Sequence, residues 1–201
     1  MKTGQAEAGQ AGTGAMRADA RRNRERLIAA ALAAFAERGS DDTSLEEIAR
    51  RAGVGIGTLY RHFPTRQALL EAVYRDQVEA LVAGTQTRLA EPPGPALIGW
   101  LRDLTQFGLT KRSLTAELLA APEGMNAPVF SACKAEIADS AQALLARAQE
   151  AGVARPELQA SDLMRLSHAI VVATERATDR AKEADRLLDI LLGGVLTPAA
   201  R

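Results

Sequence analysis

The chain has 201 residues, enough for a sizeable core and for one large or two small domains. Its 25 Lys and Arg balance 25 Asp and Glu, so the zero net charge points to neither nucleic acid nor a membrane, and any such signal must be local. The single cysteine, Cys133, excludes an intrachain disulfide and is typical of a reducing cytoplasm. No run of 18 apolar residues predicts a membrane-spanning helix.

Residues 1–16 are mostly Gly, Ala, Gln and Thr and contain almost nothing to bury. We expect a disordered tail here, and it lacks the apolar segment of a secretion signal. Because Met16 directly precedes a helical pattern, one hypothesis is that Met16 is the physiological start. Detection of Met1 or Lys2 by N-terminal sequencing of the native protein would contradict it.

A first helix is predicted over residues 18–38, where apolar residues recur every three or four positions and Gly39 provides a stop. A second, short helix is predicted over 45–52. Its start carries the capping-box pattern, in which the Ser44 hydroxyl accepts from the Glu47 backbone N–H and the Glu47 carboxylate reaches back.

Gly53 ends the second helix, and a third is predicted over residues 56–63. Pro64 stops the third helix, because the residue before a proline is excluded from the helical region by its ring. Thr65 can then cap a longer helix over 66–89, with Leu69, Leu70, Val73, Val78 and Leu81 facing inward.

The strongest break in the sequence is EPPGP, residues 91–95. No alternating β-branched run of useful length occurs, so the sequence predicts an all-α fold. We expect a three-helix domain over 17–65 and a larger helical bundle over 66–201. The helices predicted after the break cover residues 96–111, 113–121, 127–151, 161–181 and 183–196.

Two short helices joined at a glycine are typical of a helix-turn-helix, and one face of the second is not needed for packing. On that face, Ile56 suits a thymine methyl, and Gly57 permits close approach of DNA. Tyr60 and His62 suit phosphate oxygens. From residue 16 to 66, ten arginines against seven acidic residues give a local charge of +3. The arginines at 21, 22, 24 and 26 cluster at the start of the first helix and are candidates to line the DNA backbone; the alternative is a solvated helix start. The candidate DNA contacts are Ile56, Gly57, Thr58, Tyr60, Arg61, His62 and Arg66.

The stretch TSLEEIARRAGVGIGTLYRHFPTRQALLEAVY, residues 43–74, closely resembles the DNA-binding domain of the TetR family of transcriptional regulators. The preceding RERLIAAALAAFAERG is similar to the family's first helix. The resemblance implies a homodimeric repressor that binds a palindromic operator, double-stranded DNA, and whose C-terminal domain binds a small effector. It adds Ser44 to the DNA contacts. Arg66 stands where the family more often has lysine.

The last two predicted helices, residues 161–181 and 183–196, are more apolar than a helix with one buried side requires. A second copy of the chain could bury the additional apolar surface, so we expect a homodimer through these helices. The alternative is that they fill the core of a monomer.

The middle helices carry the only tryptophan and several other large apolar residues. Each alone is best explained as core, but together they fit a cavity for a small, largely apolar ligand, with His168 as a candidate polar anchor. The candidate ligand-binding residues are Trp100, Leu104, Phe107, Leu118, Phe130, Cys133 and His168.

Two distant histidines and one cysteine make a metal site an unfavourable interpretation, and no motif for a catalytic nucleophile or a cofactor occurs. We therefore expect neither an enzyme nor a bound cofactor. The first hypothesis is a ligand-responsive DNA-binding repressor. The second is a helical protein that binds small molecules without specific DNA binding.

Overall fold

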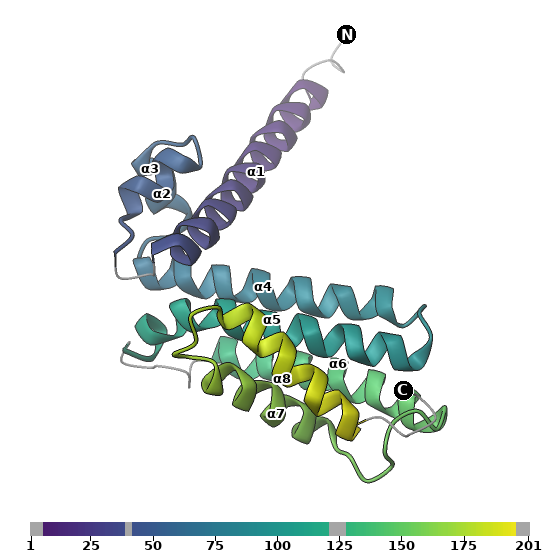
Figure 1. The fold of residues 1–201 in the computed structure, drawn as a ribbon. Helices are drawn as coiled ribbons and strands as arrows, with labels where there is room; N and C mark the ends of the chain where they lie inside the picture. The colour runs from purple at the N-terminus through teal and green to yellow at the C-terminus, as the bar shows by residue number, and fades with distance from the viewer. Residues whose placement is uncertain (1–5, 39–41, 121–127, 196–201) are drawn as a thin grey trace. The chain divides into compact units, whose positions relative to one another are not determined.

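A computed structural model describes residues 6–38, 42–120 and 128–195, with side chains described for 16–37, 42–110 and 129–195. Over these ranges the chain forms eight helices and no strand, which confirms the all-α prediction (Figure 1). The helices are α1 Ala6–Arg38, α2 Leu45–Arg51, α3 Ile56–His62, α4 Arg66–Arg88, α5 Pro93–Ala120, α6 Pro128–Glu150, α7 Ala160–Ala173 and α8 Arg180–Val195.

The chain divides into two compact units, Met1–Val73 and Tyr74–Arg201, so the division falls within α4. In the first unit, α2 and α3 lie beside the C-terminal half of α1, and α1 continues past them toward its N-terminus (Figure 1). The core of this unit consists of buried apolar side chains from α1, α2, α3 and the start of α4. Its largest members are Leu27, Phe35, Ile48, Leu59, Leu69 and Leu70.

Helix α1 starts at Ala6, within the range 1–16 where the sequence predicts a disordered tail. Extending an existing helix adds one hydrogen bond per residue without a new nucleus, and the alanines of this range favour it, whereas Gly9, Gly12 and Gly14 each oppose it by up to about 1 kcal/mol. The expected stop at Gly39 lies outside the described residues.

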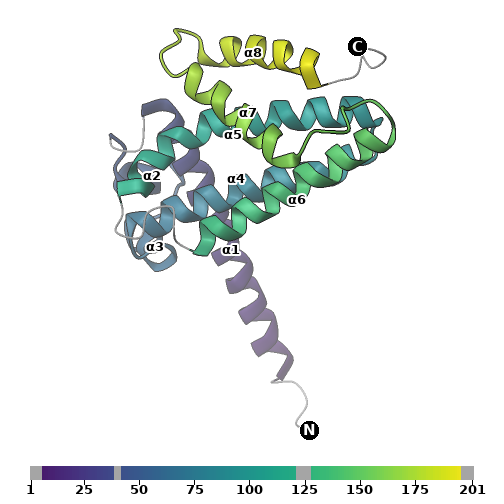
Figure 2. The same ribbon diagram turned by 90° about the horizontal axis from the view of Figure 1, so that it is seen from below.

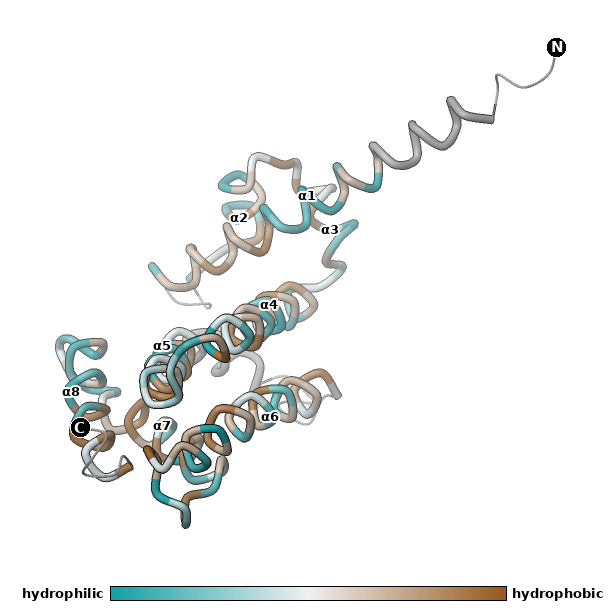
Figure 3. The backbone as a smooth tube through the Cα atoms, turned by 90° about the vertical axis from the view of Figure 1, so that its right-hand side faces the viewer, coloured by the Kyte–Doolittle hydropathy of each residue, from teal (hydrophilic) through white to brown (hydrophobic). Residues whose placement is uncertain are grey.

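In the second unit, α5 packs against α6, α7 and α8, and α7 packs against α6 and α8 (Figures 1 and 2). Trp100, Leu101 and Leu144 are among its fully buried side chains. The buried residues of α8, Ala184, Leu188, Leu192 and Val195, lie three or four positions apart on one side of the helix, and Figure 3 shows both hydrophilic and hydrophobic residues along it.

The predicted helix boundaries are wrong at two places in the second unit. Residues 93–120 form the single helix α5, not two helices divided near residue 112, because Lys111 to Ser113 contain no glycine or proline and propagation costs less than a new start. Helix α7 ends at Ala173, not at 181. The Thr174 hydroxyl there donates to the carbonyl oxygens of Ile170 (3.0 Å) and Val171 (3.2 Å), which closes the last turn.

Gly108 lets α5 approach α7 closely, since a Cβ at this position would lie 2.7 Å from Val171 Cγ2. Val171 is β-branched, has one preferred rotamer in a helix and cannot turn aside freely. We therefore expect Gly108→Ala to cost about 1–3 kcal/mol of overpacking, which outweighs the gain of about 1 kcal/mol in helix propensity.

The control is Gly84→Ala in α4, where a Cβ would meet no atom within 4 Å. We expect this variant to gain about 0.5–1 kcal/mol in the free energy of unfolding, measured by urea titration. Equal stabilisation by both substitutions would show that α5 and α7 are not in close contact at Gly108.

Candidate nucleic-acid interface

The turn between α2 and α3 has the backbone that the sequence predicts. Gly53 adopts φ +67°, a left-handed conformation that glycine adopts without steric cost. The amide of Val54 donates to the carbonyl of Ala49 at 3.0 Å, which closes the turn after Ala52. The two helices are thus joined by a single tight reversal, as a helix-turn-helix requires.

The predicted hydroxyl caps of α2 and α4 are present, whereas of the predicted capping box only the serine half is recorded, and the Glu47 carboxylate accepts from Arg51 at 3.0 Å. Ser44 Oγ accepts from the Glu47 amide at 3.2 Å, and Thr65 Oγ1 accepts from the Ala68 amide at 3.1 Å. Between them, α3 ends at Phe63, whose extended backbone (φ −134°) leads into Pro64. These local signals place the starts of α2 and α4 and the end of α3 at or within one residue of their predicted positions.

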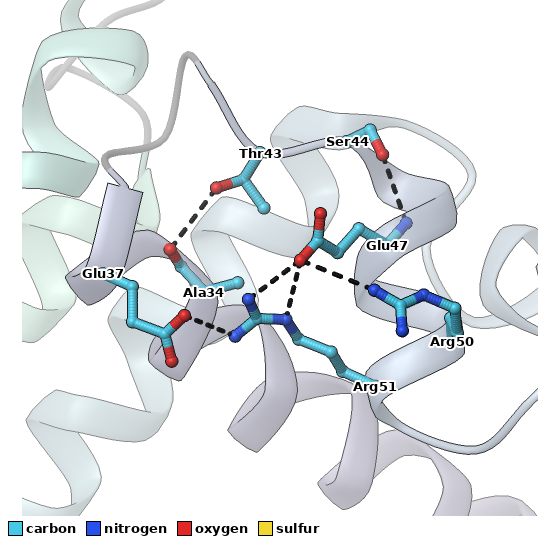
Figure 4. A network of polar contacts seen from close by, with 7 residues as sticks. All are labelled: Ala34, Glu37, Thr43, Ser44, Glu47, Arg50 and Arg51. Atoms are coloured by element: carbon cyan, nitrogen blue, oxygen red, sulfur yellow. Dashed lines mark hydrogen bonds and ion pairs between the residues drawn. The ribbon is translucent and has the colours of Figure 1, made fainter.

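An ion-pair network holds α2 against α1 (Figure 4). Arg51 Nη1 lies 2.8 Å from Glu37 Oε2, and Arg51 Nη2 lies 2.8 Å from Glu47 Oε1. Arg50 pairs more loosely with the same Glu47 oxygen, at 3.8 Å. Hydrogen bonds from Arg51, first to Glu37 and then to Glu47, raise the pKa of its guanidinium. The network joins residues 14 positions apart and fixes the orientation of α2.

Helix α3 has a buried and an exposed face. Leu59 is fully buried and Phe63 is 3% exposed, whereas the neighbouring Tyr60 is 45% exposed and Ile56 is 37% exposed. Gly57 is exposed too, and a Cβ there would meet no atom within 4 Å. Thr58 and His62 are half-buried. The exposed face therefore presents apolar, hydroxyl and imidazole groups around a glycine.

Five of the predicted DNA contacts also bond within the protein: Ser44, Gly57, Thr58, Arg61 and Arg66. Arg61 is exposed and donates to Thr58 Oγ1 (2.9 Å) and to the Gly57 carbonyl (3.3 Å) on its own helix. Arg66 is half-buried; its Nη1 donates to the Thr43 carbonyl at 2.7 Å, and its Cζ lies 5.7 Å from the Phe35 ring centroid. Ser44 is the cap of α2. Arg66 thus contributes to the core of the first unit, which its position in the sequence did not reveal.

The predicted ligand-binding residues lie mostly in the core of the second unit. Trp100, Leu104, Phe130 and Cys133 are at most 8% exposed, and Phe107 is half-buried. His168 is exposed, so it does not join this buried group. The side chain of Leu118 lies outside the described residues. A surface hollow of about 580 Å³ lies instead at the α7–α8 connection, lined by Ala173, Arg176, Ala177, Thr178, Asp179, Lys182, Glu183 and Arg186.

Two residues of α4 were not singled out from the sequence. The Tyr74 ring packs edge-on to Phe130, with centroids 5.0 Å apart, and contacts Phe107 at 6.0 Å. Arg75 Nη1 lies 2.8 Å from Glu136 Oε1 and 3.6 Å from the Cys133 sulfur. Tyr74 lies four residues after Leu70 and four before Val78, so the apolar stripe of α4 was the signal that could have found it.

Burial, with a smaller effect from Cys133, raises the pKa of the Tyr74 phenol to about 12. The folded protein keeps the phenol neutral while the unfolded chain ionises near pH 10, so this contribution to stability is complete below pH 10 and is lost as the pH rises toward 12. Between these values we expect wild type to lose about 3 kcal/mol more in the free energy of unfolding than Tyr74→Phe. Urea titrations across this pH range would measure the difference, and parallel curves for the two proteins would contradict it.

Within the described part of the chain, no group of three His, Cys, Asp or Glu side chains could hold a metal ion. Among the same residues, no helix is both long enough and apolar enough to cross a membrane.

Comparison with known proteins identifies both units. Residues 27–73 match the model "Bacterial regulatory proteins, tetR family", and 92–197 match "Transcriptional regulator SbtR-like, C-terminal domain". A TetR transcriptional regulator from Streptomyces coelicolor is 37% identical, with a TM-score of 0.75, covering 87% of this chain and 99% of that one. One from Mycobacterium vanbaalenii is 33% identical, with a TM-score of 0.72, covering 90% and 99%. The Escherichia coli K12 HTH-type transcriptional regulator UidR is 29% identical over 90% of this chain and 97% of its own length.

The fold and the exposed face of α3 define a DNA-binding regulator of transcription with a helix-turn-helix. The chain belongs to the TetR family of transcriptional regulators. A helical protein that binds small molecules without specific DNA binding is therefore not favoured.

Proposed function

We propose that the protein is a cytoplasmic, homodimeric repressor that reads a palindromic operator with α3 and is released from it by a small, largely apolar effector. The observation that carries this proposal is the exposed face of α3, where Tyr60 and Ile56 lie beside Gly57. Ile56 and Tyr60 lie four residues apart on one side of α3, so together with Gly57 they form one continuous exposed surface that a partner can cover.

Gly57 supports DNA as that partner. No atom within 4 Å would meet a Cβ at this position, so packing within the protein does not require a glycine. A glycine inside a helix costs about 1 kcal/mol relative to alanine. Close approach of the α3 backbone to base edges in the major groove accounts for that cost.

Exposed apolar residues on α7 and α8 support the homodimer. Leu166 is 36% exposed, Val172 48% and Ile190 63%. A second copy of the chain would cover the same residues by two-fold symmetry and place two α3 helices on successive half-sites, roughly 34–36 Å apart. Sedimentation of wild type against Val172→Glu/Ile190→Glu tests this interface, and a dimer that survives both charges would exclude it.

The effector site is proposed among Trp100, Leu104, Phe107, Phe130 and Cys133. The Trp100 Nε1 atom is buried without a hydrogen-bond partner among the described residues, so a ligand carbonyl or hydroxyl beside it would gain a donor. Trp100 is also the only tryptophan, so its fluorescence reports on any ligand that enters this core.

The decisive experiment is a footprint on DNA flanking the protein's own gene, because it tests DNA binding, symmetry and half-site spacing together. We expect a symmetric protected region with two half-sites about 10 base pairs apart, and its loss when an apolar ligand changes the Trp100 emission. Ligand binding with no protected region would instead support the second hypothesis, a small-molecule-binding protein without specific DNA binding.

A further inference from the structure

One face of α1 continues from the core out to solvent. Six residues repeat at alternating spacings of four and three, so they lie along one side of the helix. The three C-terminal members are at most 2% exposed, and the three N-terminal members are exposed arginines. In order they are Arg17, Arg21, Arg24, Ile28, Ala31 and Phe35. We call the first three the arginine seam.

The arginine seam starts where the recognition helix ends. The Arg24 guanidinium carbon lies 5.6 Å from the centroid of the Phe63 ring, and Phe63 is the residue that caps α3. His62, on the candidate DNA-contacting face, packs beside the same ring with centroids 6.2 Å apart. The side of α1 that faces the core therefore continues, as arginines, past the C-terminal end of α3.

Helix α3 itself carries little positive charge for a DNA-binding element. Its only arginine, Arg61, already bonds to Thr58 and Gly57 of the same helix. Residues 17–26 of α1, in contrast, hold five arginines and two acidic residues, a net charge of +3, in a chain whose total is zero. Non-specific attraction to DNA depends on cations that replace its counterions.

We propose that Arg17, Arg21 and Arg24 bind phosphates of the duplex that α3 reads, which extends the DNA interface along α1. The inference rests on the proposed function, because α3 must hold the duplex in place. At 1.5 Å per residue, Arg17 and Arg24 are about 10 Å apart along the helix, a length over which B-DNA carries about six phosphates. Three arginines on one side can thus follow one edge of a groove.

The alternative is a solvated helix end whose arginines pair only with acids of the same helix. Arg21 does lie 3.5 Å from Glu25, and Arg22 pairs with Asp19, but both pairs are exposed and such pairs contribute little. These two neighbouring arginines give a matched test. Arg21 belongs to the seam, and Arg22 points about 100° away around the helix.

The probe is a duplex selected by the wild-type protein from a random pool, and binding is measured from about 0.05 to 0.3 M salt. We expect Arg21→Gln to weaken binding about three- to tenfold and to lower the slope of log K against log salt by about 1. Arg22→Gln should stay within twofold of wild type. The triple variant of Arg17, Arg21 and Arg24 should lower the slope by about 3. Thermal unfolding of each variant checks that α1 stays folded.

Equal losses for Arg21→Gln and Arg22→Gln, or an unchanged slope in the triple variant, would overturn the arginine seam while leaving operator binding intact. Failure of the wild-type protein to select any duplex would instead contradict the proposed function.

Discussion

Truncating Leu59 to alanine is expected to destabilise the DNA-binding unit by about 2–5 kcal/mol, whereas changing its neighbour Tyr60 should weaken DNA binding alone. Leu59 is fully buried, so its loss removes apolar contacts and leaves a cavity. Tyr60 is 45% exposed, so Tyr60→Phe combined with His62→Ala should remove two phosphate hydrogen bonds with little change in stability. We expect the double variant to bind the operator about tenfold or more weakly.

Thermal unfolding and operator titration of the same preparations separate the two effects. The Leu59 variant should recover binding in a stabilising osmolyte, because its DNA-contacting face is intact when the unit is folded. The Tyr60/His62 variant should not. If the double variant binds as tightly as wild type, the proposed DNA-contacting face of α3 is wrong.

Replacing Trp100 by alanine should cost about 3–5 kcal/mol of the free energy of unfolding, since it is the largest fully buried side chain. Trp100→Phe should cost much less. Phenylalanine keeps most of the apolar area, and it removes an indole N–H that has no hydrogen-bond partner among the described residues.

Because Trp100 is the only tryptophan, both variants need urea titration by circular dichroism in place of fluorescence. A cost below about 1 kcal/mol for Trp100→Ala would mean that the site collapses or is already open.

The helix-turn-helix was predictable almost to the residue because its limits are chemical and local. Gly53, Pro64 and the hydroxyls of Ser44 and Thr65 each act within four positions of their own place in the chain. The buried and exposed faces of α3 were also predictable, because helical spacing places Leu59 and Tyr60 on different sides of the helix.

What could not be predicted depends on residues far apart in the sequence. No pattern joins Arg51 to Glu37, or Arg75 to Glu136 across 61 positions. The partial burial of Arg66 against Phe35 is also a tertiary contact, so a residue chosen as a phosphate ligand proved to stabilise the fold as well. The unbroken α5 was missed because residues 111–113 contain no glycine or proline, and extending a helix costs less than starting a new one.

The open space around Gly57 has a consequence for anyone who engineers this protein. Alanine there would improve helix propensity and meet no obstacle within the chain, so a screen for heat resistance alone would favour it. In the proposed interface, the same methyl group would stand between α3 and its operator. If α3 reads DNA as proposed, selection for heat resistance alone would therefore favour variants that bind DNA weakly, unless binding is scored in the same round.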